Sequence, residues 1–208
     1  IRKGISMPKF IDGIKKFQKE IYPKHKERFE ALANSQDPDV LFITCSDSRI
    51  DPNLITQSKP GELFICRNAG NIVPPHTHET GGMTASIEYA VCVLDVKHII
   101  LCGHSNCGAM KAAMAPETVD KLPHVKTWLD HCRAAKEAVE LEHHHLEEEH
   151  LDEVTKQNVI LQLNHLSTHP AVFKKLHTNE LTLHGWVYDI ETGRIEVYDQ
   201  QEKRFIEL

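Results

Sequence analysis

The sequence lacks any long hydrophobic segment. No apolar run in its 208 residues approaches the roughly 20 residues that a helix needs to cross a bilayer. The first residues, 1–7, also lack the apolar core of a secretory signal peptide. We therefore expect no membrane span. We expect a location in the cytoplasm, or in an organelle or microcompartment that keeps thiols reduced.

An excess of positive charge is also absent. The chain has 24 Lys and Arg against 30 Asp and Glu, a formal net charge of −6, so we expect no nucleic-acid partner. No internal repeat or low-complexity linker interrupts the sequence, and its length suits one domain with a sizeable core. We expect a single domain over residues 1–208, with a helical arm at 1–35 and the active-site core at 36–110.

Short apolar runs alternate with segments of helical periodicity. The runs at 40–44, 63–67 and 98–102 predict buried strands, and 181–189 and 194–199 predict a hairpin around Glu191-Thr192-Gly193. Helices are predicted at 7–34 (broken near Pro23), 79–94, 109–115, 119–150, 151–168 and 171–177. This order predicts an α/β fold: a central, largely parallel β-sheet flanked by helices, an N-terminal helical arm and a C-terminal strand hairpin.

Six cysteines are present, which in a small secreted chain would suggest disulfides. Here the chain is larger and shows no signal peptide, so reduced thiols are expected. Four of the six stand in apolar or helical contexts that favour packing roles: Cys66, Cys92, Cys102 and Cys132.

The other two cysteines lie where predicted strands end. Cys45 follows the run 40–44, and His104 and Cys107 follow the run 98–102. The carboxyl ends of parallel strands meet at one edge of a sheet, so these side chains are expected to lie together. Two thiolates and one imidazole leave one zinc position free, which is typical of a catalytic site. Taken singly, they would suit buried cysteines and a core histidine.

An acidic and a positively charged residue follow the first candidate ligand. Asp47 and Arg49 stand two residues apart in the loop after Cys45. A carboxylate held by a guanidinium stays ionised and keeps a fixed orientation, so it can accept a hydrogen bond from water at the metal. It could instead turn and occupy the fourth zinc position. Without a metal nearby, the same pair would be an ordinary surface ion pair.

These motifs together resemble the β-class carbonic anhydrases. The resemblance rests on Cys45-Ser46-Asp47-Ser48-Arg49 followed by Gly103-His104-Ser105-Asn106-Cys107-Gly108. The segments 61–71 (GELFICRNAGN) and 87–90 (IEYA) are similar to the family as well. The similarity runs from about Gln36 to about Met110, and the rest of the chain order is compatible with it.

The resemblance implies an activity and a site. It implies one zinc ion per chain on Cys45, His104 and Cys107, the catalytic dyad Asp47–Arg49, and a homodimer or higher homo-oligomer. It implies reversible hydration of carbon dioxide to bicarbonate and a proton through attack by zinc-bound hydroxide. The implied substrate-binding residues, some from the neighbouring subunit, are Gln36, Phe64, Ala69, Tyr89 and Gly108. Without the resemblance, Phe64 and Tyr89 would be core residues and Gln36 a solvated turn residue.

One position departs from part of the family. Some β-class enzymes carry a Trp three residues before the first zinc cysteine and favour zinc closed by the aspartate. This chain has Phe42 there. We therefore expect water rather than Asp47 at the fourth position near neutral pH.

Other interpretations remain open at this point. The same site would suit hydrolysis of carbon disulfide or a related molecule, or a non-catalytic zinc-bearing scaffold, and a redox protein would need Cys102 and Cys107 to cycle. Arg67 is expected to add positive potential or to pair with a carboxylate at a subunit contact. The His- and Glu-rich run 142–150 is expected to be a solvated helical face, although weak metal binding is an alternative.

Overall fold

The computed structural model of the chain describes residues 7–78 and 80–208 and divides into two compact units, Ile1–Gln36 and Asp37–Leu208. In the described part of the first unit, α1 (Met7–Lys16) continues through a π-helical turn (Phe17–Ile21) and a 3₁₀ turn (Tyr22–His25) into α2 (Lys26–Leu32). Pro23 lies at the start of the 3₁₀ turn, where the predicted break was placed. The rings of Phe17, Tyr22 and Phe29 stack and meet edge to face within this unit.

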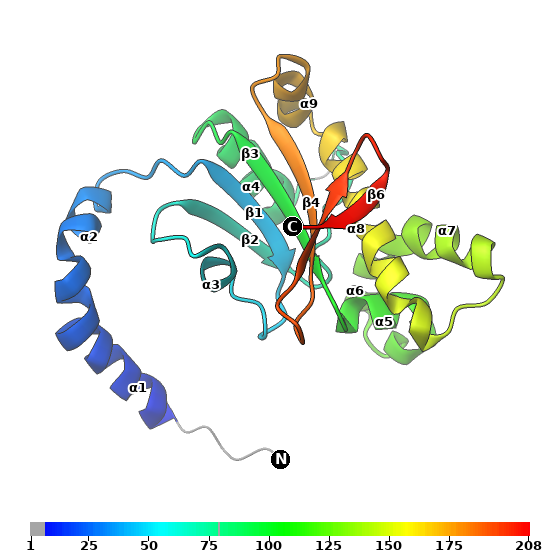
Figure 1. Cartoon of the computed structure of the whole chain (residues 1–208), viewed down its shortest axis with the longest axis horizontal. Coiled ribbons are helices and arrows are strands. Elements are labelled where there is room, and N and C mark those ends of the chain that lie inside the picture. The colour runs from blue at the N-terminus through cyan, green and yellow to red at the C-terminus, as the bar shows by residue number, and fades with distance from the viewer. Residues whose placement is uncertain (1–6, 79) are drawn as a thin grey trace. The chain divides into compact units, whose positions relative to one another are not determined.

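The second unit is built on one six-stranded sheet, in the order β2-β1-β3-β4-β5-β6 (Figure 1). The first four strands of that order are parallel, and β5 and β6 complete the sheet as antiparallel strands. The strand bounds are β1 Val40–Cys45, β2 Leu63–Asn68, β3 His98–His104, β4 Thr182–Tyr188, β5 Ile195–Asp199 and β6 Arg204–Glu207. This architecture confirms the predicted fold class, including the C-terminal hairpin of β4 and β5.

The helices of this unit lie between its first four strands in the sequence: α3 follows β1, α4 follows β2, and α5 to α9 all follow β3. Their bounds are α3 Pro52–Thr56, α4 Gly82–Cys92, α5 Gly108–Met114, α6 Pro123–Leu129, α7 Arg133–His143, α8 Leu151–Thr168 and α9 Pro170–His177. Asp51 caps α3 by accepting a hydrogen bond from the Leu54 N–H, and Pro52 occupies the first helical position. Part of the predicted helix 79–94 falls on residue 79, which lies outside the described residues.

The prediction of a continuous helix over 119–150 is wrong. Pro123 begins a new helix, because a proline disfavours helical geometry in the residue before it. His144 ends α7 in the left-handed region at φ 61°, and a separate 3₁₀ turn occupies Glu148–His150. The sequence analysis also did not predict β6, a short and mostly exposed edge strand.

One face of the sheet packs against α4, α8 and α9. Leu41, Ile43, Ile99 and Leu101 of the central strands form its core, and α8 contributes apolar side chains such as Val159. Helix α8 approaches the sheet closely at two glycines: a Cβ on Gly103 would lie 2.9 Å from Val159 Cγ2, and one on Gly185 would lie 2.9 Å from Val159 Cγ1 and Leu163 Cδ1. Glycine is therefore required at both positions for this packing.

A second apolar cluster lies beside the carboxyl ends of β1 and β3. It joins Cys45 and Cys107 to Ile72 and to residues of α5, α6 and α7, which Figure 1 shows grouped on one side of the sheet. The opposite face of the sheet carries a third cluster around Phe42, whose ring meets Trp186 edge to face. Across the ranges 7–78 and 80–208, no helix is both long and apolar enough for a bilayer crossing.

Candidate metal centre

The three predicted ligands lie together at the carboxyl edge of the sheet. Cys45 is the last residue of β1, His104 is the last residue of β3, and Cys107 directly precedes α5. Their ligand atoms are all within 4.8 Å of one another, and the residues are 5%, 0% and 1% exposed, respectively. The arrangement is a buried set of two sulfurs and one imidazole nitrogen, drawn from the ends of two neighbouring strands and from the loop after β3.

The hydrogen bonding of His104 prepares one ring nitrogen for a metal. Its Nδ1 lies 2.9 Å from the carbonyl oxygen of Ser105, which can only accept, so Nδ1 carries the proton in the neutral ring. Nε2 then presents a lone pair toward the cysteines, and this buried atom has no hydrogen-bond partner among the described residues. A buried, unpartnered nitrogen beside two thiols fits a soft divalent cation.

The two thiols cannot both ionise easily on their own. The facing Cys107 thiol lowers the pKa of Cys45, and the His104 ring and the Gly70 N–H lower it further, against the opposing effect of burial. The closeness of Cys45, followed by burial, raises the pKa of Cys107. A cation between the sulfurs would remove this conflict, because a metal favours the thiolate form of each ligand.

Asp47 and Arg49 form a two-point ion pair beside this cluster. Arg49 Nε donates to Asp47 Oδ1 at 2.9 Å, and Nη2 donates to Oδ2 at 2.7 Å. The Arg49 hydrogen bonds lower the pKa of Asp47, so the carboxylate stays ionised. Asp47 Oδ2 lies 3.9 Å from His104 Nε2, which places the carboxylate at the edge of the metal cluster.

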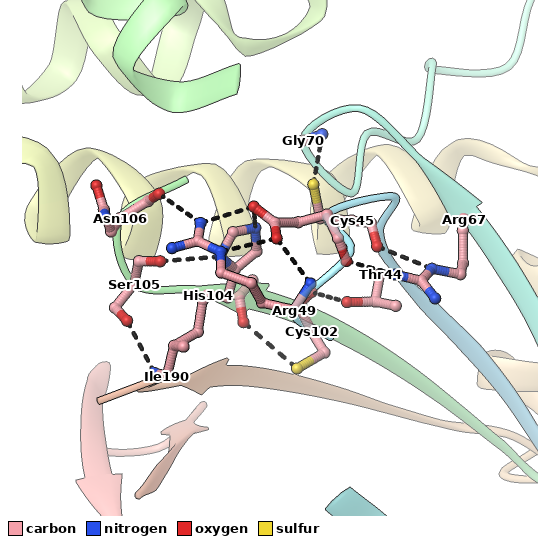
Figure 2. A network of polar contacts seen from close by, with 12 residues as sticks. Thr44, Cys45, Arg49, Arg67, Gly70, Cys102, His104, Ser105, Asn106 and Ile190 are labelled. Atoms are coloured by element: carbon pink, nitrogen blue, oxygen red, sulfur yellow. Dashed lines mark hydrogen bonds and ion pairs between the residues drawn. The ribbon is translucent and has the colours of Figure 1, made fainter. Parts of the chain in front are cut away.

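Two arginines hold the loop that carries this pair. Arg49 Nη2 also donates to the carbonyl of Asn106, at 3.1 Å, and so links the loops after β1 and β3. Arg67 reaches from β2 and donates to the carbonyls of Cys45 and Asp47, at 3.0 and 2.7 Å (Figure 2). Within one chain, Arg67 therefore clamps the main chain on either side of Ser46, and its expected pairing with a carboxylate at a subunit contact stays a prediction.

The loop after β2 supplies a hydrogen bond to one sulfur. The Gly70 N–H points at Cys45 Sγ with a separation of 3.4 Å (Figure 2). Gly70 has φ +82°, a conformation suited to glycine, and a Cβ there would lie 3.1 Å from Ala109 Cβ and Met110 Cε. The tight geometry predicted for residues 68–71 is thus present and directs a backbone donor at a candidate ligand.

Two buried amide side chains on α8 form hydrogen bonds that hold the loop after β2 in place. Asn158 donates from Nδ2 to the Gly70 carbonyl at 3.2 Å, and its Oδ1 accepts from Gln162 Nε2 at 2.9 Å. Gln162 Oε1 accepts from the Val73 N–H at 2.9 Å, and Gln162 Nε2 also donates to the His131 carbonyl. Both amides are fully buried. Sequence analysis missed them, because a single amide on an apolar helix gives no local signal for a partner about 90 residues away.

The predicted substrate-binding residues fall into two groups. Ala69 adjoins Gly70 and accepts a hydrogen bond from Trp128, and Gly108 follows Cys107, with open space where a Cβ would stand. Phe64 instead pairs in register with Leu41, four residues before Cys45 on β1, and its ring lies 6.0 Å from that of Tyr89. Within one chain, these two aromatic residues lie together but away from the metal edge.

Gln36 is the last residue of the N-terminal unit. Its role in substrate binding therefore stays a prediction.

Cys102 is set apart from the ligands. It is fully buried on β3, and burial raises its pKa to about 12. Reactive cysteines need an accessible thiolate, so this environment disfavours the redox alternative and agrees with a packing role.

Comparison with known proteins gives the same family as the motifs. The family described as "Carbonic anhydrase" matches residues 40–195, three quarters of the chain. The structure titled "The structure of the beta-carbonic anhydrase CcaA" superposes with a TM-score of 0.94 and 44% identity, covering 97% of this chain and 99% of that one. The chain belongs to the β-class carbonic anhydrase family.

Two further relatives of this β-class carbonic anhydrase are informative. A carbonic anhydrase of Pseudomonas aeruginosa is 50% identical over 202 residues, which are 97% of this chain and 92% of that protein. A structure of one of two tetrameric β-carbonic anhydrases from Sordaria macrospora is 34% identical, with a TM-score of 0.74 over 91% of this chain and 92% of that one. The family membership therefore covers almost the whole chain, beyond the loops that carry the motifs.

Proposed function

We propose that this protein is a zinc-dependent carbonic anhydrase that interconverts carbon dioxide with bicarbonate and a proton. The observation that carries the proposal is the convergence of Cys45, His104 and Cys107 beside the ion-paired carboxylate of Asp47. A structural zinc site is normally closed by four protein ligands. Three ligands with a polar dyad beside them suit a reaction at the metal.

The donor set fits zinc, with Cys45 Sγ, His104 Nε2 and Cys107 Sγ as the residues that would hold it. Bound zinc would supply Lewis-acid activation of water near neutral pH. The Ser105 carbonyl orients the imidazole of His104, and the Gly70 N–H steadies the thiolate of Cys45. Such interactions behind metal ligands tune how strongly the ligands donate.

The Asp47 carboxylate would accept a hydrogen bond from the attacking water. This contact would turn a lone pair of the water oxygen toward carbon dioxide. Arg49 keeps that carboxylate ionised and turned to one position, because it binds both of its oxygens. The same pairing supports water rather than Asp47 as the fourth ligand, as Phe42 also led us to expect. Gly108 leaves room beside the metal edge for the small substrate, since a Cβ there would meet nothing within 4 Å.

A homo-oligomer completes this proposal. Helix α1 exposes Met7, Phe10, Ile11 and Ile14, an apolar stripe that suits burial against a second copy. A second copy would also bring Phe64 and Tyr89 from the neighbouring chain to the metal edge, which they do not reach within their own chain. The tetrameric relatives from Sordaria macrospora support an assembly of this kind.

The experiment is carbon dioxide hydration measured by stopped flow on protein stripped of metal and then reloaded with zinc. We expect activity to disappear with the metal and to return at one zinc per chain, and Cys107→Ser to lose both zinc and activity. Activity that survives stripping would contradict the proposal.

A zinc-loaded protein that hydrates no carbon dioxide at any pH would also contradict it. Carbon disulfide hydrolysis should then be assayed, and its absence would leave the scaffold role.

A further inference from the structure

The junction between α7 and α8 gathers a second set of metal-binding side chains, away from the site described above. His143 is the last residue of α7, and Glu153 lies in the first turn of α8. The chain reverses between the two helices, so these residues meet: His143 Nε2 lies 2.8 Å from Glu153 Oε2. The Glu142 carboxylate joins them, and the ligand atoms of all three residues lie within 4.8 Å of one another.

We propose that Glu142, His143 and Glu153 form a second metal site, for a first-row transition metal ion such as Zn²⁺. Imidazole with carboxylate is a donor set that these ions accept, and three protein ligands leave the remaining positions to water. The side chains of His143 and Glu153 are 37% and 36% exposed, so an ion can enter from solvent without any rearrangement of the core.

The local charge favours a cation at this place. The segment 137–153 contains no Lys or Arg and eight acidic residues: Glu137, Glu140, Glu142, Glu147, Glu148, Glu149, Asp152 and Glu153. Several of these acids already pair with lysines or arginines outside the segment, as Glu140 does with Lys136 and Asp152 with Lys156. Among the described residues, neither Glu142 nor Glu153 pairs with a Lys or Arg, so their charge is left for another cation.

The neighbouring loop holds the His143 ring in place. The His150 ring lies against it, with centroids 4.2 Å apart and ring planes tilted by 35°. His150 is itself fixed by a capping box: its Nδ1 accepts from the Glu147 N–H at 2.9 Å, and the Glu147 side chain accepts from the His150 N–H. Because Nδ1 accepts, the neutral His150 ring carries its proton on Nε2 and supports His143 without acting as a ligand. The site is therefore a positioned imidazole with two carboxylates.

The helix ends around the cluster suit its charges. His143 stands at the carboxyl end of α7, where the helix dipole favours a positive charge, and Glu153 stands at the amino end of α8, where it favours a carboxylate. A bound ion would join the ends of the two helices and replace the direct contact between His143 and Glu153.

The test is isothermal titration of Zn²⁺ into protein that already holds one zinc per chain, with His143→Ala, Glu153→Gln and the control His145→Ala. His145 is a histidine of the same loop outside the cluster. We expect one further zinc per chain in the wild type and in His145→Ala. Affinity should fall at least about tenfold in both cluster variants. Glu153→Gln keeps the size and a hydrogen-bond acceptor, so it separates the ligand role from helix packing if His143→Ala loosens the junction.

Three results would overturn the site. They are no second equivalent in the wild type, a second equivalent that survives both cluster substitutions, and equal weakening in His145→Ala, which would assign binding to the histidine run as a whole. Carbon dioxide hydration and far-ultraviolet circular dichroism of each variant show whether the rest of the protein is intact.

Discussion

Asn158→Leu tests whether α8 supports the candidate metal centre. The substitution keeps roughly the side-chain volume but removes the hydrogen bonds to the Gly70 carbonyl and from Gln162 Nε2. A buried polar group left without a partner costs about 1–3 kcal/mol. Gln162 Nε2 keeps its bond to the His131 carbonyl. We therefore count the full cost for the Gly70 carbonyl and only part of it for the Gln162 amide. Together they give an expected loss of about 2–4 kcal/mol in the free energy of unfolding.

The assay is urea unfolding of the zinc-loaded protein at one fixed protein concentration, followed by tryptophan fluorescence. A loss of this size lowers the midpoint by roughly 1 M, given slopes of about 1–3 kcal/mol/M. Asn164→Leu is the matched control, because Asn164 is an exposed asparagine on the same helix, and it should change the free energy by less than about 0.5 kcal/mol. Equal effects of the two substitutions would refute the reasoning.

The same variant should also change the metal centre. The Gly70 peptide is held by Asn158 and donates to Cys45 Sγ. We therefore expect Asn158→Leu to shift the thiolate-to-metal charge-transfer band of the cobalt-substituted protein. An unchanged band with lowered stability would limit Asn158 to a role in folding.

Two further predictions concern the scaffold. Gly185→Ala should destabilise the fold by about 1–3 kcal/mol, because the added Cβ would lie 2.9 Å from Val159 and Leu163. Thermal unfolding measures this loss. The control Gly13→Ala should show no such loss, because a Cβ at Gly13 would meet nothing within 4 Å. Hydrogen bonds from Lys175, and to a smaller extent from Lys97, lower the pKa of Asp95 to about 2. These ion pairs therefore stabilise the fold fully at pH values above the usual aspartate pKa, and the stabilisation is lost as the pH falls through about 2. In Lys175→Met, carbon-13 NMR should show Asp95 titrating at higher pH, and an unchanged titration would contradict this assignment.

The predictable part of the fold lies where sequence signals are local. The buried strands are short apolar runs, and the helix at 151–168 has a regular apolar face, so both were predicted close to their observed bounds. The region 119–150 was not, because helical composition hid the break at Pro123 and the left-handed end of α7 at His144. Strand β6 has only four residues and little burial, so it gave no pattern.

In the candidate site, too, some residues could be predicted from the sequence and others could not. Cys45, His104 and Cys107 could be grouped from sequence because the carboxyl ends of neighbouring parallel strands must meet, and Asp47 and Arg49 pair over two residues. The clamp by Arg67 and the support by Asn158 and Gln162 could not, because their partners are mainly backbone N–H and C=O groups, which every non-proline residue carries and which therefore give no signal in the sequence. The hydrogen bonds that hold the ligand loops in place are thus visible only in the three-dimensional structure.

The dyad gives the most direct test of the proposed chemistry. Stopped-flow carbon dioxide hydration should be compared across pH between the wild type and Asp47→Ala, each at one zinc per chain. We expect fast hydration by the wild type around neutral pH and a loss of about 10²-fold or more in kcat for the variant at unchanged zinc content, because Asp47 orients the attacking water. Wild-type activity confined to alkaline pH would contradict water as the fourth ligand, and equal rates for the two proteins would contradict the role of Asp47.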